Sequence, residues 1–581
     1  MQRPPDSIVR RDPREGALAR TLGIPDLMAR VLLARGMDDP EKARQHLRPE
    51  LDTLSDPFRF VHMERAVARI RDAVARREPI LIHGDYDVDG VSGTVLLLHF
   101  FALLDAEVKA HIPERKDGYS FSAASLAAVQ QTGSRLCISV DNGTNAGEWI
   151  RRIQEAGCDV IVTDHHGTSE DVAPAHTILN PRLPGAGYPD TDLAGVGVAF
   201  RLVTALAQSF SRGRLLSTEF RDFLLDAVGY VALGTVADMA PLRGENRVLV
   251  HHGLRALAVS SNPGIRALLD AANLGSHRTP DAEDVAFRLA PLINAAGRMG
   301  NARDAVRLLT ARSYAEAQEL ARQLETHNQE RRRVERQLVE VALAEARGND
   351  DPILVLAGDG WHPGVLGIVA ARVLDLLGRP TILISFDGEQ GRGSGRACAG
   401  FDLRAALGQC ASSLRAYGGH AAAVGLEIER GRLDEFRRRL NQTTSHDAAR
   451  TPAPGAEVEA GFAELDPRAV RKLDALGPFG VGNRRPLFVA RDTRLVGSPQ
   501  VDGRNQDLRF RLTQSGILLP ARLRAGSLRF EELRRADGAL DVVFSPRLAQ
   551  WAEEGPVELV VQAVHTHGNG AIVPGPGAKR P

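Results

Sequence analysis

The chain has 581 residues, which exceeds the usual size of one domain and predicts three or four separate hydrophobic cores. Its hydrophobic share of 43% and charged share of 25% are typical of soluble globular proteins, and no apolar run approaches the roughly 20 residues of a membrane span. Because 73 basic residues balance 73 acidic ones, the net charge provides no long-range attraction to a polyanion. Any nucleic-acid binding must therefore come from local patches.

The beginning of the chain, residues 1–55, is charged and contains prolines, and we expect an N-terminal extension without visible chemistry. It lacks the basic and then apolar layout of a signal peptide, so we expect a cytoplasmic protein with no membrane association. The cysteines show no CxxC spacing, and we expect all of them to be reduced thiols: Cys137, Cys158, Cys398 and Cys410.

An α/β domain is predicted over residues 56–310. Short apolar runs alternate there with helical segments, which favours a mostly parallel sheet with crossover helices. A helix is predicted over 91–104, directly after an acidic motif. The predicted strands are 80–82, 136–140, 160–162 and 177–179.

A long helix is predicted over 313–347, within a linking segment of residues 311–348. Its polar centre, 325–333, is expected to be exposed, as in a helix that joins two lobes. A second α/β lobe follows over 349–445, with strands at 353–356 and 381–384. We expect glycine-rich turns at 391–400 and 418–419.

A small β-barrel is predicted after a linker at 444–455 that is rich in Thr, Ala and Pro. It occupies residues 446–568, and its expected strands include 487–490, 508–512 and 540–544. A disordered tail is expected over 569–581. The predicted fold class is therefore α/β, with two lobes joined by a long helix and followed by a small β-barrel.

The strongest local signal is the run His83-Gly-Asp85-Tyr-Asp87-Val-Asp89-Gly, placed between a predicted strand and a predicted helix. In an extended segment these four side chains share one face. Three carboxylates and an imidazole so close together suit a divalent cation with a preference for oxygen ligands. A solvated acidic loop is the alternative reading of this motif taken by itself.

The next two predicted strands end in the same kind of residue. Asp141 follows one strand, and Asp164-His165-His166 follows the other. Because the carboxyl ends of parallel strands lie along one edge of a sheet, these side chains are expected to meet in one crevice. Such a mixed set suits Mn²⁺ or Mg²⁺, and two ions about 3.5 to 4 Å apart would support an in-line phosphoryl displacement. Asp87 or Asp141 would be a candidate bridge between them.

These motifs, together with the segment 234–242, resemble in order and context those of the DHH phosphoesterase superfamily. The resemblance implies that His166 meets the scissile phosphate, that Asp164 orients its neighbours, and that Asp85 acts either behind the metal ligands or as one of them. It also implies a set of metal ligands: His83, Asp87, Asp89, Asp141, His165 and Asp238.

The segments 361–370, 393–396 and 418–425 look like the DHH-associated substrate-binding domain. Glycine turns combined with Arg and Ser suit phosphate, because amides, a hydroxyl and a guanidinium can surround it. Further motifs at 112–119, 293–299 and 477–483 resemble the RecJ family. By that resemblance a terminal 5′ phosphate is held by Arg115, Arg298, Ser394 and Arg396, and substrate is also contacted by Gly419 and His420.

What the RecJ resemblance implies is an exonuclease that degrades single-stranded DNA from its 5′ end to 5′-mononucleotides, in DNA repair and recombination. The barrel would be an OB-type fold that grips single strands, although its few aromatic residues are expected to serve the core. We expect a monomer, with a single-strand-binding protein and a RecQ-like helicase as partners. Three departures from the family pattern, Ala397, Val424 and Ser120, bear on substrate grip.

Two alternatives stay open. One is a DHH phosphodiesterase for short oligonucleotides or cyclic dinucleotides, which the length of this chain disfavours. The other is a catalytically silent DHH scaffold of a replication complex, which the presence of all the motif carboxylates and His165 disfavours.

Overall fold

The computed structural model describes residues 11–114, 120–168, 172–211, 216–275, 278–398, 400–442, 444, 455–502, 507–524, 526, 530–535, 538–549, 556–566 and 571–572. The chain divides into two compact units. The parallel-sheet unit comprises Arg48–Arg331 and Gly477–Arg484. The barrel unit comprises Met1–Leu47, Arg332–Leu476 and Arg485–Arg580.

A five-stranded, all-parallel sheet forms the centre of the parallel-sheet unit. Its order is β2-β1-β3-β4-β5. The four predicted strands are confirmed. β2 was not predicted, because Val-Lys-Ala-His is half exposed and lacks the apolar run of a central strand. The strands are β1 (Ile80–His83), β2 (Val108–His111), β3 (Leu136–Val140), β4 (Asp159–Thr163) and β5 (Thr177–Leu179).

Helices cover this sheet, and the most apolar of them, α5 (Val88–Leu103), follows β1 directly. It begins three residues before the predicted helix and packs against α8 and α9 in one continuous core. The helices of this unit are α4 (Met63–Ala75), α5, α6 (Ala123–Thr132), α7 (Gly147–Glu155), α8 (Gly195–Phe210), α9 (Thr218–Ala237), α10 (Gly244–Val259), α11 (Pro263–Ala271), α12 (Ala282–Asp284), a π-helical turn (Val285–Leu289), α13 (Ala290–Met299) and α14 (Arg303–Leu309).

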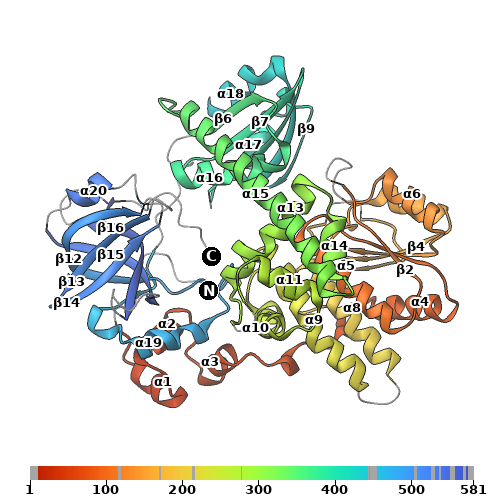
Figure 1. Ribbon diagram of the computed structural model, residues 1–581, viewed down its shortest axis with the longest axis horizontal. Helices are drawn as coiled ribbons and strands as arrows, with labels where there is room; N and C mark the ends of the chain where they lie inside the picture. Colours follow the sequence, from red (N-terminus) through yellow and green to blue (C-terminus); the bar gives the residue numbers. More distant parts are fainter. Residues whose placement is uncertain are drawn as a thin grey trace. The chain divides into compact units, whose positions relative to one another are not determined.

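The predicted long helix is confirmed as α15 (Tyr314–Glu345), the green helix labelled in Figure 1. Its residues up to Arg331 belong to the parallel-sheet unit, and those from Arg332 belong to the barrel unit. The expectation of an exposed centre is wrong at Asn328 and Arg331, which are both buried. Arg331 donates two hydrogen bonds to the Asn328 side-chain oxygen, at 3.1 and 3.0 Å. Polar side chains that satisfy one another in this way can be buried.

The barrel unit contains a five-stranded mixed sheet of order β6-β7-β8-β10-β9, in which β6 and β7 are parallel and the other pairs are antiparallel. Its strands are β6 (Leu354–Asp359), β7 (Thr381–Asp387), β8 (Gln390–Arg396), β9 (Ala416–His420) and β10 (Ala423–Glu429), and its helices are α16 (Leu366–Leu377), α17 (Leu403–Gln409) and α18 (Leu433–Gln442).

The glycine-rich turns expected at 391–400 and 418–419 are wrong for most of their length, since β8 and β9 run through them. The glycines serve close packing instead of turning. A Cβ on Gly393 would lie 2.9 Å from Leu426 and 3.0 Å from Ile384. Only glycine lets the neighbouring strands' side chains fill that space.

A closed five-stranded barrel confirms the predicted C-terminal β domain, because β12-β13-β14-β16-β15 is completed by pairing of β12 with β15. The expected strands fall in β12, β13 and β15, whereas β14 and β16 were not predicted. The remaining elements are α1 (Glu15–Leu22), α2 (Asp26–Ala34), α3 (Pro40–Leu47), β11 (Val458–Glu459), α19 (Pro467–Leu473), β12 (Phe488–Asp502), β13 (Asp507–Gln514), β14 (Ile517–Leu523), α20 (Phe530–Arg534), β15 (Leu540–Leu548), β16 (Val557–Thr566) and β17 (Ala571–Ile572).

The N-terminal helices belong to the barrel unit. Arg30 of α2 is buried and bonds to Glu15 at 2.7 Å and to Glu464 at 2.8 Å. All four cysteines are buried and form no disulfide, as predicted. Within the described part of the chain, no helix has both the length and the hydropathy needed to cross a membrane.

Candidate metal centre and phosphate site

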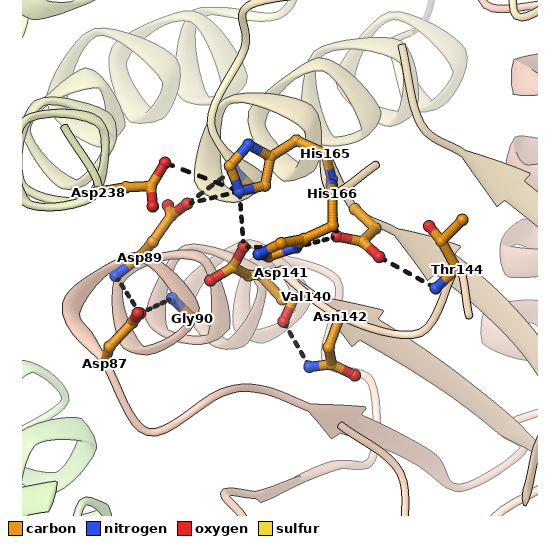
Figure 2. A network of polar contacts seen from close by, with 12 residues as sticks. Asp87, Asp89, Gly90, Val140, Asp141, Asn142, Thr144, His165, His166 and Asp238 are labelled. Carbon is orange, nitrogen blue, oxygen red and sulfur yellow. Dashed lines mark hydrogen bonds and ion pairs between the residues drawn. The ribbon is translucent and has the colours of Figure 1, made fainter. Parts of the chain in front are cut away.

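An acidic cluster lies where β1, β3 and β4 end, at the carboxyl edge of the parallel sheet (Figure 2). Asp85 comes from the connection between β1 and α5, Asp89 lies in the first turn of α5, Asp141 directly follows β3, and His165 follows β4. All four side chains are buried. The predicted convergence of separate strand ends on one crevice is therefore confirmed.

The expectation that residues 83, 85, 87 and 89 share one extended face is wrong, because the strand ends at His83 and a helix starts at Val88. Asp87 caps that helix: its Oδ1 accepts hydrogen bonds from the amides of Asp89 (2.9 Å) and Gly90 (3.2 Å). Gly90 packs on Asp85, where a Cβ would lie 2.5 Å from the amide nitrogen. The tight strand-to-helix connection thus brings the carboxylates together by another route.

Asp89 is held by the N-terminus of α8. Its two carboxylate oxygens accept hydrogen bonds from the amides of Gly195 (2.8 Å) and Val196 (2.9 Å), which a helix N-terminus offers to an anion. Glycine is required at this contact, because a Cβ on Gly195 would lie 2.6 Å from that of Asp141. The sequence reasoning missed these two amides, although the run Gly195-Val-Gly at the start of an apolar stretch was available as a signal.

His165 is the centre of the cluster. Its Nε2 lies 3.1 Å from Asp141 Oδ1, 3.7 Å from Asp238 Oδ2 and 3.9 Å from Asp89 Oδ2. Asp238 is the C-terminal capping residue of α9, so a fourth element reaches the same point. A single proton on this ring nitrogen can satisfy only one carboxylate, whereas a cation would satisfy all of them.

Burial raises the pKa of both Asp89 and Asp141 well above the usual range, and their carboxylate neighbours add to the effect. Burial, with Asp87, raises the pKa of Asp238 to about 7. Burial and the neighbouring His166 lower the pKa of His165 to about 3, so its imidazole is neutral and can donate a lone pair. This donor set fits a hard divalent cation, which would take the place of the bound protons.

Three groups of side chains have ligand atoms within 4.8 Å of one another: Asp85–Asp87–Asp141, Asp89–His165–Asp238 and Asp141–His165–His166. Asp141 and His165 each belong to two groups. This sharing is the arrangement that a pair of neighbouring cations requires.

Asp164 supports the histidines. Its Oδ1 accepts from the amides of His165 (2.7 Å) and His166 (3.1 Å) and from His166 Nδ1 (2.8 Å), and its Oδ2 accepts from the Thr144 amide (3.0 Å). Although burial opposes it, the hydrogen bonds from His166 and Thr144 hold the pKa of Asp164 below its usual range. The same contact outweighs burial and raises the pKa of His166.

His83 lies apart from the three groups. It is buried, its Nε2 is 2.8 Å from Ser125 Oγ, and its ring stacks on Phe121 with 4.1 Å between centroids. Burial and the neighbouring His111 lower its pKa to about 3.

A second polar site lies in the barrel unit, on β8. Arg396 donates to Ser394 Oγ (3.1 Å) and to Gly395 O (2.8 Å), and burial lowers its pKa. Its guanidinium lies against the first turn of α16, where a Cβ on Gly367 would be 2.6 Å from Arg396 Nη2 and 3.0 Å from Ser394 Oγ. In the described part of the chain no carboxylate pairs with Arg396. A partly buried cation beside a hydroxyl and a helix N-terminus is suited to an anion.

The other predicted substrate-binding residues lie on different elements of the two units. Gly419 and His420 are exposed on β9, and Gly419 has a φ of +120°. Arg298 lies in α13 of the parallel-sheet unit, beside Gly297, where a Cβ would lie 2.7 Å from Tyr86 O of the acidic motif. Arg115 lies outside the described residues.

The structure also shows the environment of the three residues that depart from the family pattern. Ala397 and Val424 are buried members of the core behind the mixed sheet, so they pack inward. Ser120 has a φ of +74°, which explains why glycine suits that position.

Three family models match the chain: the DHH family N-terminal domain over residues 79–228, the DHHA1 domain over 350–446 and the RecJ OB domain over 456–563. The single-stranded-DNA-specific exonuclease RecJ of Bacillus subtilis is 35% identical over 83% of this chain and 61% of its own length. That of Dickeya dadantii is 35% identical over 82% of this chain and 85% of its own. This chain thus spans less than two thirds of the first relative.

Solved structures agree with these matches. RecJ from Thermus thermophilus in complex with Mn²⁺ has a TM-score of 0.79 and 28% identity, covering 97% of this chain and 79% of its own. Its complex with Mg²⁺ has a TM-score of 0.74 at the same identity, covering 97% and 78%.

Proposed function

The chain belongs to the RecJ family, and on that premise we propose that it is a single-stranded-DNA-specific exonuclease that releases 5′-mononucleotides from the 5′ end by metal-dependent phosphodiester hydrolysis. The observation that carries the proposal is the position of His165 Nε2, which faces carboxylate oxygens from three other elements within 3.9 Å. Such a cluster of buried carboxylates does not stabilise the fold, and its ligand atoms are suited to divalent cations.

Two Mn²⁺ or Mg²⁺ ions, when bound, would lower the pKa of a water and offset the charge of the phosphoryl group. Asp141, a member of two ligand groups, is the proposed bridge between them. The proposed ligands that complete the set are Asp87, Asp89, His165 and Asp238, with Asp85 beside Asp87 as a direct or supporting ligand and His83 as a further candidate behind them.

His166 and Asp164 handle the scissile phosphate in this scheme. The Asp164 carboxylate stabilises the protonated form of His166, because it accepts the hydrogen bond from Nδ1 at 2.8 Å. The resulting imidazolium would donate a hydrogen bond to a phosphate oxygen and neutralise developing negative charge. Asp164 would act by positioning and charging its neighbour.

The terminal 5′ phosphate is proposed to bind at Ser394 and Arg396, with Arg115, Arg298, Gly419 and His420 as further contacts. Support comes from the Arg396 guanidinium, which is partly buried beside a hydroxyl and the first turn of α16. A phosphate there would receive a charge-assisted hydrogen bond and backbone donors.

The barrel is proposed to grip the single strand through phosphates more than through stacking. Phe488, Phe510 and Phe544 are buried, which confirms the expectation that they serve the core. Arg494 and Arg511 are exposed on the paired strands β12 and β13. Since these three rings are in the core, binding should depend strongly on salt and weakly on base identity.

The wider biological scheme is also a proposal. It comprises action in DNA repair and recombination in the cytoplasm, as a monomer, with a single-strand-binding protein and a RecQ-like helicase as partners. The proposed division is a catalytic domain at 56–310, a linking helix at 311–348, a substrate-binding domain at 349–445 and a nucleic-acid-binding barrel at 446–568.

The test is metal-dependent digestion of a 5′-labelled and a 3′-labelled single-stranded oligonucleotide, with blunt duplex and dinucleotide controls. Release of the 5′ label as a mononucleotide from the first time points, with Mn²⁺ or Mg²⁺ and not on duplex, is the expected result. Cleavage of the dinucleotide alone would establish the short-substrate alternative. Absence of both cleavage and cation binding would establish the silent scaffold.

A further inference from the structure

The motif at 477–483 resembles the RecJ family, but none of its residues takes part in the proposed metal or phosphate binding. After Leu476 the chain leaves the barrel unit, contributes Gly477–Arg484 to the parallel-sheet unit, and then resumes the barrel unit. These eight residues, the 477–484 loop, are tied internally. Gly480 N donates to Asn483 O (2.9 Å), Asn483 N to Gly480 O (3.2 Å) and Asn483 Nδ2 to Pro478 O (2.7 Å).

The 477–484 loop contacts the segment that connects α9 to α10 and the first turn of α10. Val481 O accepts a hydrogen bond from Leu242 N at 2.6 Å, and Gly477 O accepts one from Arg247 Nη2 at 2.7 Å. A Cβ on Gly480 would lie 2.7 Å from Leu242 Cδ1. The backbone of the loop can therefore approach the connecting segment only because a side chain is missing there.

The connecting segment begins with Asp238, one of the cluster carboxylates. Its first residues are fixed by α9, since Asp238 N donates to Gly234 O (2.9 Å) and Ala240 N to Thr235 O (3.2 Å). Its far end is fixed by the hydrogen bond from Leu242 to the 477–484 loop. Between these two attachments the backbone is constrained, with Met239 at a φ of +60°.

We propose that the 477–484 loop is a positioning element for Asp238, and that it sets the affinity of the Asp89–His165–Asp238 group for a divalent cation. The proposal rests on the proposed function for the role of Asp238 as a ligand. Ligands held by surrounding contacts bind a metal more tightly than ligands that must be ordered on binding, and loss of such support typically costs about 10–100-fold in affinity.

Gly482→Ala is the direct test, with Gly497→Ala as its matched control. Gly482 has a φ of +76°, and a Cβ there would lie 3.1 Å from Pro241 Cβ. Gly497 has a φ of +74° with nothing within 4 Å of a Cβ. Its alanine variant therefore has the same backbone strain but no steric contact with a neighbour. Both variants are titrated as full-length protein with Mn²⁺, and free Mn²⁺ is measured by electron paramagnetic resonance.

We expect Gly482→Ala to weaken one class of Mn²⁺ sites about tenfold, while Gly497→Ala binds Mn²⁺ like the original chain. On single-stranded DNA, Gly482→Ala should lower kcat at limiting Mn²⁺, recover it at high Mn²⁺ and leave KM unchanged. Equal Mn²⁺ affinities for the two variants would overturn the proposal.

If the melting temperature of the Gly482→Ala variant in a chelator is well below that of Gly497→Ala, the Mn²⁺ titration is repeated with Asn483→Ala. That substitution removes the hydrogen bond to Pro478 O and adds no atoms. Weakened Mn²⁺ binding supports the proposal, and unchanged binding overturns it. The titration needs no nuclease activity. A chain that binds Mn²⁺ without cutting DNA therefore contradicts the proposed function and leaves this test intact, whereas a chain that binds no Mn²⁺ overturns both.

Discussion

Asp141 shows how one residue can be costly to the fold and yet central to the acidic cluster. Its backbone has a φ of +64°, it is buried, and its Oδ1 lies 3.1 Å from His165 Nε2. Burial and the neighbouring carboxylate of Asp89 raise its pKa. A non-glycine residue in the left-handed region with an unfavourable buried charge is characteristic of a functional position.

Asp141→Asn should therefore separate activity from stability. Asn tolerates the left-handed backbone and removes the buried charge, so the melting temperature in a chelator should equal or exceed that of the original chain. Nuclease turnover should fall at least about a hundredfold, because a proposed bridging ligand is lost. Asp105→Asn is the control, an exposed aspartate with a φ of 49°. Turnover within twofold of the original chain would refute the role of Asp141.

Asp164→Asn should lower the pKa of His166, because the hydrogen bond to the carboxylate is what raises it against the effect of burial. The measurement is a nuclear magnetic resonance titration of the His166 ring in the cation-free protein. The protonated form should disappear at lower pH than in the original chain. An unchanged or raised pKa would show that Asp164 does not control His166.

At the scale of elements, two helix N-termini meet at the metal centre. Asp87 caps α5, and Asp89 accepts the amides at the start of α8. α8 can approach β3 only because Gly195 has no side chain, while Gly197, two residues further along, has an ordinary contact 3.4 Å from Leu193. The geometry of the centre therefore depends on how close one helix lies to one strand end.

Gly195→Ala and Gly197→Ala form a matched pair within the first turn of α8. The first should destabilise the protein by about 1–3 kcal/mol through overpacking against Asp141 and should weaken Mn²⁺ binding. The second should change stability by less than about 1 kcal/mol, since alanine favours the helix and has room there. Chemical denaturation and Mn²⁺ titration measure both effects. Equal losses in the two variants would contradict the close approach inferred at Gly195.

At the scale of the whole molecule, the acidic cluster links stability to pH and to cations. Asp238 has a pKa of about 7 in the folded chain, and the pKa values of Asp89 and Asp141 are raised in the same direction. The folded state therefore holds more protons than the unfolded state above about pH 4. The contribution of these groups to stability is present at low pH and is lost as pH rises toward 7.

The gain in melting temperature on adding Mn²⁺ should consequently grow from pH 5 to pH 8, because the cation competes with protons that leave over that range. Differential scanning calorimetry at matched ionic strength, with KCl in place of Mn²⁺ as the control, measures this gain. A gain that is constant or falls with pH would contradict cation binding at these carboxylates.

The sequence by itself indicated which residues are candidates for the site and roughly where the strands lie. Alternation of apolar runs with helices indicated four of the five parallel strands, and carboxylates after three of them indicated one crevice, because parallel strands end at a common edge. The long helix α15 was predicted within two residues at each end. The half-exposed strand β2 was not predicted, since its four residues carry no apolar run.

Only the tertiary structure decided how those residues are held. Three contacts join segments far apart in the chain: the amides of Gly195 and Val196 on Asp89, the first turn of α16 beside Arg396, and the hydrogen bond of the 477–484 loop to Leu242. Local patterns misled where glycines were taken for turns and where polar residues of α15 were taken as exposed. For the glycines of β8 close contacts with neighbouring strands outweighed local preference. In α15 the hydrogen bonds between Arg331 and Asn328 satisfy polar groups that are buried, and burial is not revealed by the residue pattern alone.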